Sequence, residues 1–462
     1  MGLTAGRVRR YPSPPMRAKT SFRLKKPHFT AGCLLLLAGA LWAQEPEPIL
    51  DRPTRLSDPS PVLPMTAAPV LDTMTLFPDA AENISLESAV DKHPWKFVLH
   101  GSATAAYNSN IFISHEDEQE DFIFTIAPGI AVGRGDFKSE LGNLGSYEDR
   151  FNPDRSDMVT GSNYIFLHAI PAVMLFADHS GEDSFVPDIS LHGQYEWKRL
   201  TLGMKARFQV LNVPDADLGE LVRRNVFTGA LTSRYDYSPK TSVELNYFNY
   251  IRDYEGNHTN SMENRWQAWA NYQVRPKVTL GVGFTYGMVN LSRGPNQSYE
   301  QALARLRYRA TEKIRFDLTA GVEVRDIHGI TSRTNGIYSL GVSYAPFDGT
   351  SVFLQAYRRT VTSANSTPAN YNVTGVEVQL RQRFLRRYYF VLAAGYQHVD
   401  YEYFTNSNHR RDEIFYIHPS VGIDVTSWLS CELGAEYRTD SSSDPASGFN
   451  ETTAYFQVNV FF

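Results

Sequence analysis

The sequence predicts an all-β chain that forms a transmembrane antiparallel β-barrel of about 18 strands, with 16 as the alternative. Three observations predict this fold. Polarity alternates with a period of two from residue 95 to residue 462. Short polar turns recur every 36 to 41 residues, and longer polar segments lie between them. The chain also ends on an aromatic residue that closes a strand.

The alternation is clear in "LSCELGAEYR", where Leu429, Cys431 and Leu433 share one face and polar residues share the other. A soluble sandwich would alternate too, so two further features decide. Candidate strands of roughly 10 to 14 residues suit a tilted membrane span. Aromatic residues also gather beside the short turns, where a membrane barrel carries a girdle. The predicted girdle consists of Trp197, Phe347, Tyr388, Tyr389 and Trp428.

We therefore expect strands near the following ranges: 96–107, 121–133, 163–177, 188–197, 199–211, 224–237, 241–253, 262–274, 278–290, 299–310, 314–326, 336–345, 351–361, 371–384, 388–401, 412–425, 428–438 and 451–462. An even number of strands places both ends of the chain in the periplasm. The segment 134–161 is too long for a periplasmic turn, and it could plug the lumen.

The chain divides into three predicted parts. Residues 1–43 predict a secretory signal peptide, because a basic stretch precedes the apolar run 31–41, which is about half the length of a membrane helix. A buried helix is the alternative. Residues 44–94 contain nine prolines and predict a disordered periplasmic segment, either a spacer or a docking site for a periplasmic partner. Residues 95–462 form the predicted barrel.

Charge and cysteine content narrow the possible partners. Removing residues 1–43 removes eight Lys and Arg and no acid, so the net charge changes from -5 to -5 - 8 = -13. This charge disfavours nucleic acid. Only Cys431 remains, so we expect neither an internal disulfide nor a cysteine metal site.

The stretch "YNSNIFISHEDEQEDFIFTIAPGI", residues 107–130, predicts two strands joined by an acidic loop at the outer surface. The acidic run is expected to be solvated, with a Ca²⁺ site as the minor alternative. Pro128 and Pro419 each interrupt an apolar strand, and we expect a bulge or a break at both.

This stretch resembles the start of the putative beta-barrel porin 2 family. The similarity extends through "LFADHSGEDSFVPDISLHGQYEW" and "LTLGMKARFQ", and we expect it to cover residue 95 to the end. The resemblance implies location in the outer membrane of a Gram-negative-type bacterium. Some relatives are associated with exopolysaccharide export.

Charged residues on the polar side of the strands are the candidate lumen-lining site. They are Lys205, Arg207, Glu244, Arg305, Arg307, Arg309, Arg315, Glu323, Arg325, Glu377, Arg381, Arg383, Glu432 and Glu436. They predict either a passage that sorts solutes by charge or an Arg–Glu ladder that braces the wall, and the two are compatible. The glycines 281, 283, 287, 341 and 395 are expected to leave room in the lumen, and Tyr250, Trp269 and Tyr455 could offer faces to sugar rings.

Catalytic chemistry is not predicted. His168, His192, His398 and His418 fall in mid-strand without a nucleophile motif, so they are expected to be ordinary wall residues. No phosphate loop, zinc spacing or dinucleotide fingerprint occurs, and we expect no cofactor, no metal and no enzyme activity.

The last strand carries Phe456, Val458, Val460 and Phe462 on one face. This pattern resembles the signal read by the barrel-assembly machinery, so that machinery and outer-membrane lipid are the expected partners. The first functional hypothesis is a porin-like passive channel for small hydrophilic solutes or saccharides. The alternative is a non-conducting structural or exopolysaccharide-export accessory barrel.

Overall fold

The computed structural model describes residues 95–135, 137, 163–367, 369–385, 387–404 and 409–462. All of them belong to the second of two compact units, Arg55–Phe462. The first unit, Met1–Thr54, lies outside the described residues, and so does the rest of the predicted proline-rich segment up to residue 94. Among the described residues, no helix has the length and apolarity needed to span a bilayer.

Eighteen strands make up the described chain, together with two short 3-10 helices, η2 (Ser180–Glu182) and η3 (Pro445–Ser447). The strands are β1 (Trp95–Asn108), β2 (Asp121–Gly135), β3 (Tyr164–Phe176), β4 (Ser184–Trp197), β5 (Leu200–Asp215), β6 (Glu220–Ser238), β7 (Thr241–Tyr254), β8 (Ser261–Arg275), β9 (Val278–Leu291), β10 (Gln297–Arg309), β11 (Ile314–Ile327), β12 (Thr331–Tyr344), β13 (Thr350–Thr362), β14 (Ala369–Phe384), β15 (Tyr388–Tyr403), β16 (Arg411–Asp424), β17 (Leu429–Ser442) and β18 (Phe449–Phe461).

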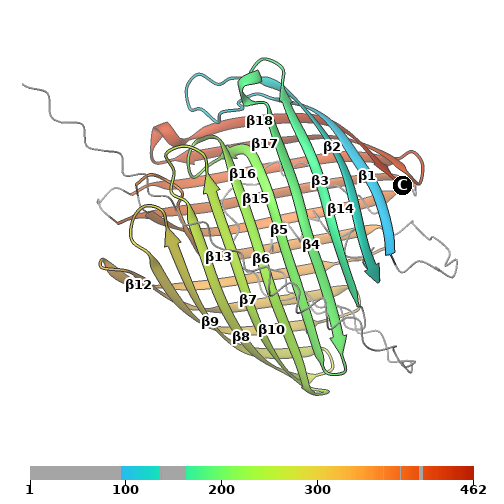
Figure 1. The fold of residues 1–462 in the computed structure, drawn as a ribbon, viewed down its shortest axis with the longest axis vertical. Helices are drawn as coiled ribbons and strands as arrows, with labels where there is room; N and C mark the ends of the chain where they lie inside the picture. Colours follow the sequence, from blue (N-terminus) through green and yellow to red (C-terminus); the bar gives the residue numbers. More distant parts are fainter. Residues whose placement is uncertain (1–94, 136, 138–162, 368, 386, 405–408) are drawn as a thin grey trace, which may run out of the picture. The chain divides into compact units, whose positions relative to one another are not determined.

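The sheet is a closed antiparallel barrel. Each strand pairs with the next along the chain, and β1 pairs with both β2 and β18 (Figure 1). The closing ladder runs from His100 opposite Phe461 to Asn108 opposite Thr453. Closure satisfies the backbone groups that a free edge would leave unpaired. The predicted 18-stranded barrel is confirmed, and the alternative of 16 strands is wrong.

The two faces of the barrel wall differ in polarity. Large hydrophobic side chains such as Phe97, Phe124, Val282 and Leu433 lie exposed on the outward face. Charged and amide side chains on the inward face are mostly buried. This distribution is the reverse of a soluble protein, in which large hydrophobic residues collect inside.

Aromatic residues do gather beside the short turns. Trp197, Phe347, Tyr388 and Trp428 are exposed there, as predicted. Tyr389 is a correction, because it is buried and faces inward. Since Tyr388 and Tyr389 are neighbours in β15, the alternation of a strand sends their side chains to opposite faces.

The two strand prolines interrupt the hydrogen-bonded ladder without shifting its register. Pairing of β2 with β3 stops at Ile126 and resumes at Ile130, on either side of Pro128. Pairing of β16 with β17 stops at Ile417 and resumes at Ser420. The break that we expected therefore occurs at both prolines, because proline offers no N–H to the neighbouring strand. Register shifts occur elsewhere, beside the turns at Asp236/Ser238 and Gln273/Arg275.

The connections at the two ends of the barrel differ. Short turns join β4 to β5, β6 to β7 and β8 to β9 at the end where the described chain begins and stops. The connections at the other end, which we call the loop end, include 109–120, 177–183, 216–219, 363–368 and 404–410. The long connection from β2 to β3 lies mostly outside the described residues. Its described residue Phe137 is fully buried and stacks on Phe166, with ring centroids 5.2 Å apart.

Candidate functional site

The inward face of the barrel holds all fourteen charged residues that the alternation placed there. Eight of them are buried and the other six are partly buried. The buried residues are Glu244, Arg305, Arg307, Glu323, Arg325, Glu377, Glu432 and Glu436, and the partly buried residues are Lys205, Arg207, Arg309, Arg315, Arg381 and Arg383.

Several of these residues form ion pairs along the wall. Arg305 Nη1 lies 3.1 Å from Glu244 Oε2, and Arg325 Nε lies 2.8 Å from Glu323 Oε1. Two more pairs use acids outside the predicted set: Arg207 with Asp188 at 2.6 Å, and Arg383 with Asp424 at 2.8 Å. These contacts are the bracing ladder that we considered, and they hold the charged groups in fixed positions.

Glycines on the inward face lie directly opposite aromatic rings of the neighbouring strand. A Cβ atom at any of these glycines would lie 1.9–2.7 Å from a ring atom, so only glycine admits the ring. This packing repeats along the barrel in six Tyr or Trp pairs: Gly283–Trp269, Gly287–Tyr299, Gly375–Tyr357, Gly395–Tyr416, Gly422–Tyr389 and Gly434–Tyr455. The prediction that inward glycines leave open room is therefore wrong at Gly283, Gly287 and Gly395.

Most of these rings also hold the charges beside them. The Tyr357 hydroxyl donates to Glu377 at 2.8 Å, and the guanidinium of Arg359 lies 4.6 Å from the Tyr357 ring centroid. The Tyr299 hydroxyl contacts Glu263, and Arg325 lies over its ring. Each of these tyrosines thus holds an acidic side chain with its hydroxyl group and a basic side chain with the face of its ring. The wall unit of glycine, tyrosine, acid and arginine was missed in the sequence, because its members come from different strands.

The four candidate histidines are wall residues, and three of them make structural contacts. His168 Nε2 lies 2.8 Å from His100 Nε2, and His192 stacks on Phe166. His418 contacts Glu436 at 3.1 Å and the Tyr455 hydroxyl at 2.9 Å, while His398 lies on the outward side of β15. Within the described part of the chain, no group of three or more His, Cys, Asp and Glu side chains could hold a metal ion.

The loop between β1 and β2 reaches inward at its start. Ile111 and Ile113 are buried, and Ile111 packs with Met174 and Phe176 of β3. The following acidic residues 116–118 are exposed, as predicted. Asp121 then ends the loop, and its carboxylate accepts bonds from the backbone N–H groups of 177, 178 and 179. The apolar "NIFI" part of the motif therefore covers the lumen, and the acidic part faces solvent.

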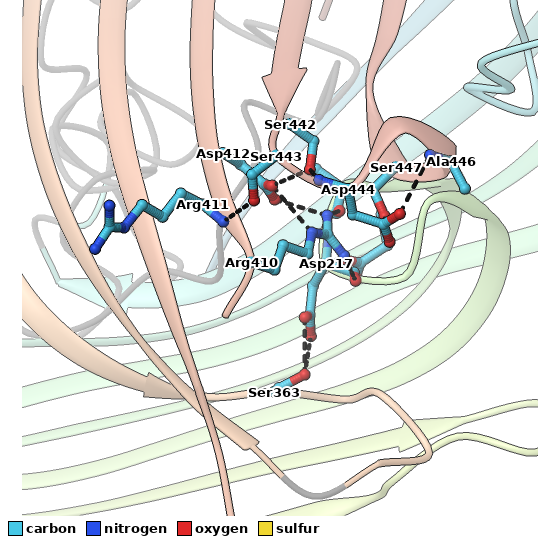
Figure 2. Close-up of polar contacts among 12 residues, drawn as sticks. Asp217, Ser363, Arg410, Arg411, Asp412, Ser442, Ser443, Asp444, Ala446 and Ser447 are labelled. Atoms are coloured by element: carbon cyan, nitrogen blue, oxygen red, sulfur yellow. Dashed lines mark hydrogen bonds and ion pairs between the residues drawn. The ribbon is translucent and has the colours of Figure 1, made fainter. Parts of the chain in front are cut away.

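Three connections that are far apart in the chain meet over the lumen at Asp217, Ser363, Arg410 and Asp412, which we call the latch (Figure 2). Arg410 donates to the carbonyl oxygens of Ala216 at 2.9 Å and Asp217 at 3.1 Å. The Asp217 carboxylate accepts from Ser363 Oγ at 2.8 Å and from the Ala364 N–H at 2.7 Å. Asp412 holds Arg410 in place at 2.6 Å. The latch ties the β5–β6 turn to the loops after β13 and β15.

The Asp217 carboxyl has an altered affinity for protons. Burial and the neighbouring Asp215 carboxylate raise its pKa to about 6, although the bonds from Ala364 and Ser363 and the charge of Arg410 act in the opposite direction. Burial disfavours the charged form of a carboxyl. The latch therefore contains a group that titrates near neutral pH.

The loop-end parts of β13 and β14 have left the barrel wall and lie inside the lumen. Their outward positions Thr360, Thr362, Asn370 and Asn372 are only 2–6% exposed. The following contacts join them to inward residues of the opposite wall: Arg252 donates to the Thr362 carbonyl at 3.0 Å, the Thr259 hydroxyl donates to the Asn365 carbonyl at 2.7 Å, and Asn370 donates to Gln297 at 2.9 Å. We call residues 358–374 the inserted hairpin. The sequence contains a signal for this insertion, because every outward strand position of the hairpin is polar.

These features define the protein as a closed β-barrel with an apolar outer face, a charged inner face and loops packed across one end. No protein-family model matches the chain. No curated protein matches it either. The resemblance to the putative beta-barrel porin 2 family therefore stays a prediction from the sequence.

Solved structures of *Pseudomonas aeruginosa* outer-membrane proteins share a limited likeness with the chain. The structure of OpdK with vanillate has a TM-score of 0.40 at 10% identity and covers 79% of this chain and 99% of its own. OpdQ has a TM-score of 0.44 at 9% identity, with 80% and 99% covered. OccK2 (OpdF) has a TM-score of 0.42 at 10% identity, with 80% and 98% covered. At these values, the functional argument rests on the chain's own residues.

Proposed function

We propose that the protein is an outer-membrane channel for small hydrophilic solutes, saccharides included, and that loops gate its mouth at the loop end. The observation that carries the proposal is the reversed polarity of the closed wall. Exposed apolar side chains suit contact with lipid, and charged inward side chains suit water.

The arrangement of charge supports selection of solutes by charge. Arg305, Arg307, Arg381 and Arg383 lie on the inward side of β10 and β14. Rows of basic side chains in a confined passage lower the barrier for anions. Because aromatic rings and acids hold many of these groups, we expect the passage to keep a fixed charge pattern. Membership of the putative beta-barrel porin 2 family belongs to the same proposal.

The packed mouth supports gating. The latch and the inserted hairpin bring buried polar groups together over the lumen, so solutes pass at this end only when those contacts separate. Cross-lumen hydrogen bonds of this kind have two discrete states, made and broken, which is the requirement for a gate.

The same packed mouth is the observation that favours the alternative, a non-conducting barrel. In that case the barrel would hold a periplasmic partner through residues 44–94 and would serve exopolysaccharide export, as the sequence resemblance implies. A permanently packed mouth would then be part of the structure and would never open.

Single-channel conductance of the refolded mature chain in a planar bilayer tests the proposal. We expect discrete current steps, with anion preference in the reversal potential under a salt gradient. The double variant Arg381→Gln/Arg383→Gln should shift that potential toward cations, and Arg387→Gln, exposed in the neighbouring turn, is the matched control. A folded barrel that passes no current, both as the native chain and with Arg410→Ala in the latch, would support the non-conducting alternative.

A further inference from the structure

The ladder between β12 and β13 is short. It pairs Tyr338–Tyr344 with Val352–Arg358 and stops there. Above it, β12 continues its pairing with β11 as far as Thr331, and β13 continues its pairing with β14 as far as Thr362. In the described ladders, the strand segments 331–337 and 359–362 thus have a strand partner on one side only. The wall parts here because the inserted hairpin turns into the lumen.

The opening lies level with apolar residues of the outer face. Gly336 is opposite Val322 of β11, and Thr334 is opposite Val324. Both valines are exposed on the outward face. Unpaired backbone at hydrocarbon depth is tolerated only where it is covered by protein or borders a water-filled cavity. The edge of β12 therefore requires such a cavity behind it.

A cavity lies behind the opening, between the edge of β13 and the inward faces of β7–β12. Its free volume is about 50 Å³. Ile337 and Tyr338 line it at the opening, and charged residues line its interior. Four arginines (252, 325, 358, 359) and two glutamates (263, 323) contribute 4 - 2 = +2 formal charges. The cavity thus has an apolar entrance and a net positive interior.

Side-chain contacts bridge the opening in the part of the chain that the structure describes. The Asn335 amide donates to the Thr360 hydroxyl at 3.2 Å, and Arg333 pairs with Glu402 of β15 at 2.5 Å. Thr360 in turn donates to Asn372 at 2.8 Å. Separating these side-chain contacts costs less free energy than separating a continuous backbone ladder, because each contact can be replaced by water independently of the others.

We propose that the opening between β12 and β13 is a lateral portal through which an amphiphile with an anionic head group and an alkyl tail passes between the cavity and the membrane. The arginines receive the head group, and the apolar entrance and the neighbouring valines accommodate the tail. This inference rests on the membrane location in the proposed function. It adds a route through the wall to the axial route through the mouth.

Fluorescence quenching tests the portal. A bimane label is attached to Thr319→Cys, which lines the cavity, in the Cys431→Ser background, and the full mature chain is reconstituted in lipid nanodiscs. The probe is stearate with a nitroxide on its chain, and a tailless, water-soluble nitroxide carboxylate serves as comparison. A second label at Thr232→Cys, on the inward face of β6 away from the cavity, measures quenching through the intact wall.

We expect the stearate probe to quench the Thr319 label several-fold more than the Thr232 label. Gly336→Phe should abolish this difference, because a Cβ there has no atom within 4 Å and the ring can fill the opening. Gly181→Phe, in η2, is the matched control, since its Cβ is equally free of neighbours. The tailless carboxylate should quench the Thr319 label equally in the protein without a glycine substitution, in the Gly336→Phe variant and in the Gly181→Phe variant.

A reversible lock gives the second measurement. The Asn335→Cys/Thr360→Cys pair joins the two strands where their side chains already touch, so oxidation should suppress the stearate effect and reduction should restore it. Equal quenching at both labels, or quenching that survives both Gly336→Phe and the lock, would overturn the portal. Quenching can be measured without any ion current. A barrel that passes no current but still shows selective quenching of the Thr319 label would contradict the proposed channel and support the portal.

Discussion

The hairpins β9–β10 and β13–β14 are built from similar parts but end in different places. Each contains a tyrosine opposite a glycine, with an arginine over the ring: Tyr299 with Gly287, and Tyr357 with Gly375. In β9 the outward positions carry the exposed residues Phe284, Tyr286 and Met288. In the inserted hairpin the outward positions are polar and buried.

This difference teaches how a barrel wall is specified. The apolar outward residues of β9 keep this hairpin in the wall, because charged and amide groups would be costly in contact with lipid. Threonine and asparagine at the same positions of β13–β14 obtain hydrogen-bond partners by turning into the lumen. Polar residues at buried outward positions, such as Thr360 and Asn372, therefore mark a segment that has left the wall.

The largest effect is expected from removing the latch arginine. Arg410→Ala leaves Asp412 buried without its ion pair, and breaking a buried pair costs about 3–5 kcal/mol. The inserted hairpin should then separate from the β5–β6 turn, and the open probability in planar bilayers should rise by about two to four orders of magnitude until it saturates.

Arg411→Ala is the matched control for this change. Arg411 is 66% exposed on its side chain and pairs with Asp400 at 3.3 Å, and exposed pairs contribute little. We expect its current record to equal that of the native chain. Equal records for both variants would show that the latch does not hold the mouth.

The next effect is a dependence of the gate on pH. The Asp217 pKa is about 6 in the closed mouth against an ordinary value of 3.8, so the closed state binds the proton more tightly than an open, hydrated state would. Closing is therefore strongest below about pH 4 and weakens as pH rises to 6, by about 3 kcal/mol in total. The open probability should rise between pH 4 and pH 7.

Asp217→Asn should remove this step and keep the mouth closed, because the amide oxygen still accepts from Ser363 and Ala364 and carries no charge. Asp117→Asn, in the exposed acidic loop, should leave the pH profile unchanged. A pH profile that Asp217→Asn does not flatten would assign the titration to another group.

A smaller effect, on the stability of the barrel, is expected from disturbing the glycine–tyrosine packing that the two hairpins share. The Cβ of Gly287→Val would lie 2.1 Å from the Tyr299 ring, and that of Gly375→Val 2.7 Å from the Tyr357 ring. Overpacking of this kind costs about 1–3 kcal/mol, and we expect both variants to lower the urea midpoint of the refolded barrel. Gly193→Val is the control, since its nearest neighbour lies at an ordinary 3.6 Å. A loss in only one hairpin would show that the two wall units are not equivalent.

The smallest effect on the mouth and the two hairpins is expected from deleting the last residue of the chain. Phe462 exchanges backbone bonds with Leu99 at 2.7 and 3.2 Å, and its ring stacks on Trp428. Deleting Phe462 should cost about 1 kcal/mol in hydrogen bonding. It should also lower the yield of heat-modifiable barrel if the last strand carries the assembly signal. Phe347→Ala is the control, with 74% exposure against 75% for Phe462. The gating of the barrels that do fold should not change.

The sequence predicted the strands well and their loop-end limits less well. The starts of β6 and β12, Glu220 and Thr331, lie four and five residues before the expected positions 224 and 336. At β12 the missed residues 331–335 are all polar, and apolar alternation fades where a strand extends beyond the apolar belt. At β6 the missed residues include the adjacent apolar pair Leu221 and Val222, which does not alternate. The inward placement of Arg305 and Glu323 also follows from alternation alone.

The partners of those residues did not follow from the sequence. Glu244 reaches Arg305 across two intervening strands, and this contact depends on the register of three ladders. Asp217 and Ser363 are 146 positions apart, and Arg410 and Ala216 are 194 apart. No local pattern connects residues at such separations.

The amino-acid sequence by itself determined the alternation of side chains along the strands and the opposite polarity of the two faces, and it narrowed the number of strands to 18 or 16. These properties depend on the period of a strand, which is local. The tertiary structure decided where the wall parts, which loops meet over the lumen and which charges are paired. Those features depend on register and on closure of the sheet, because only the closed barrel brings β7, β13 and β15 to the same point in space.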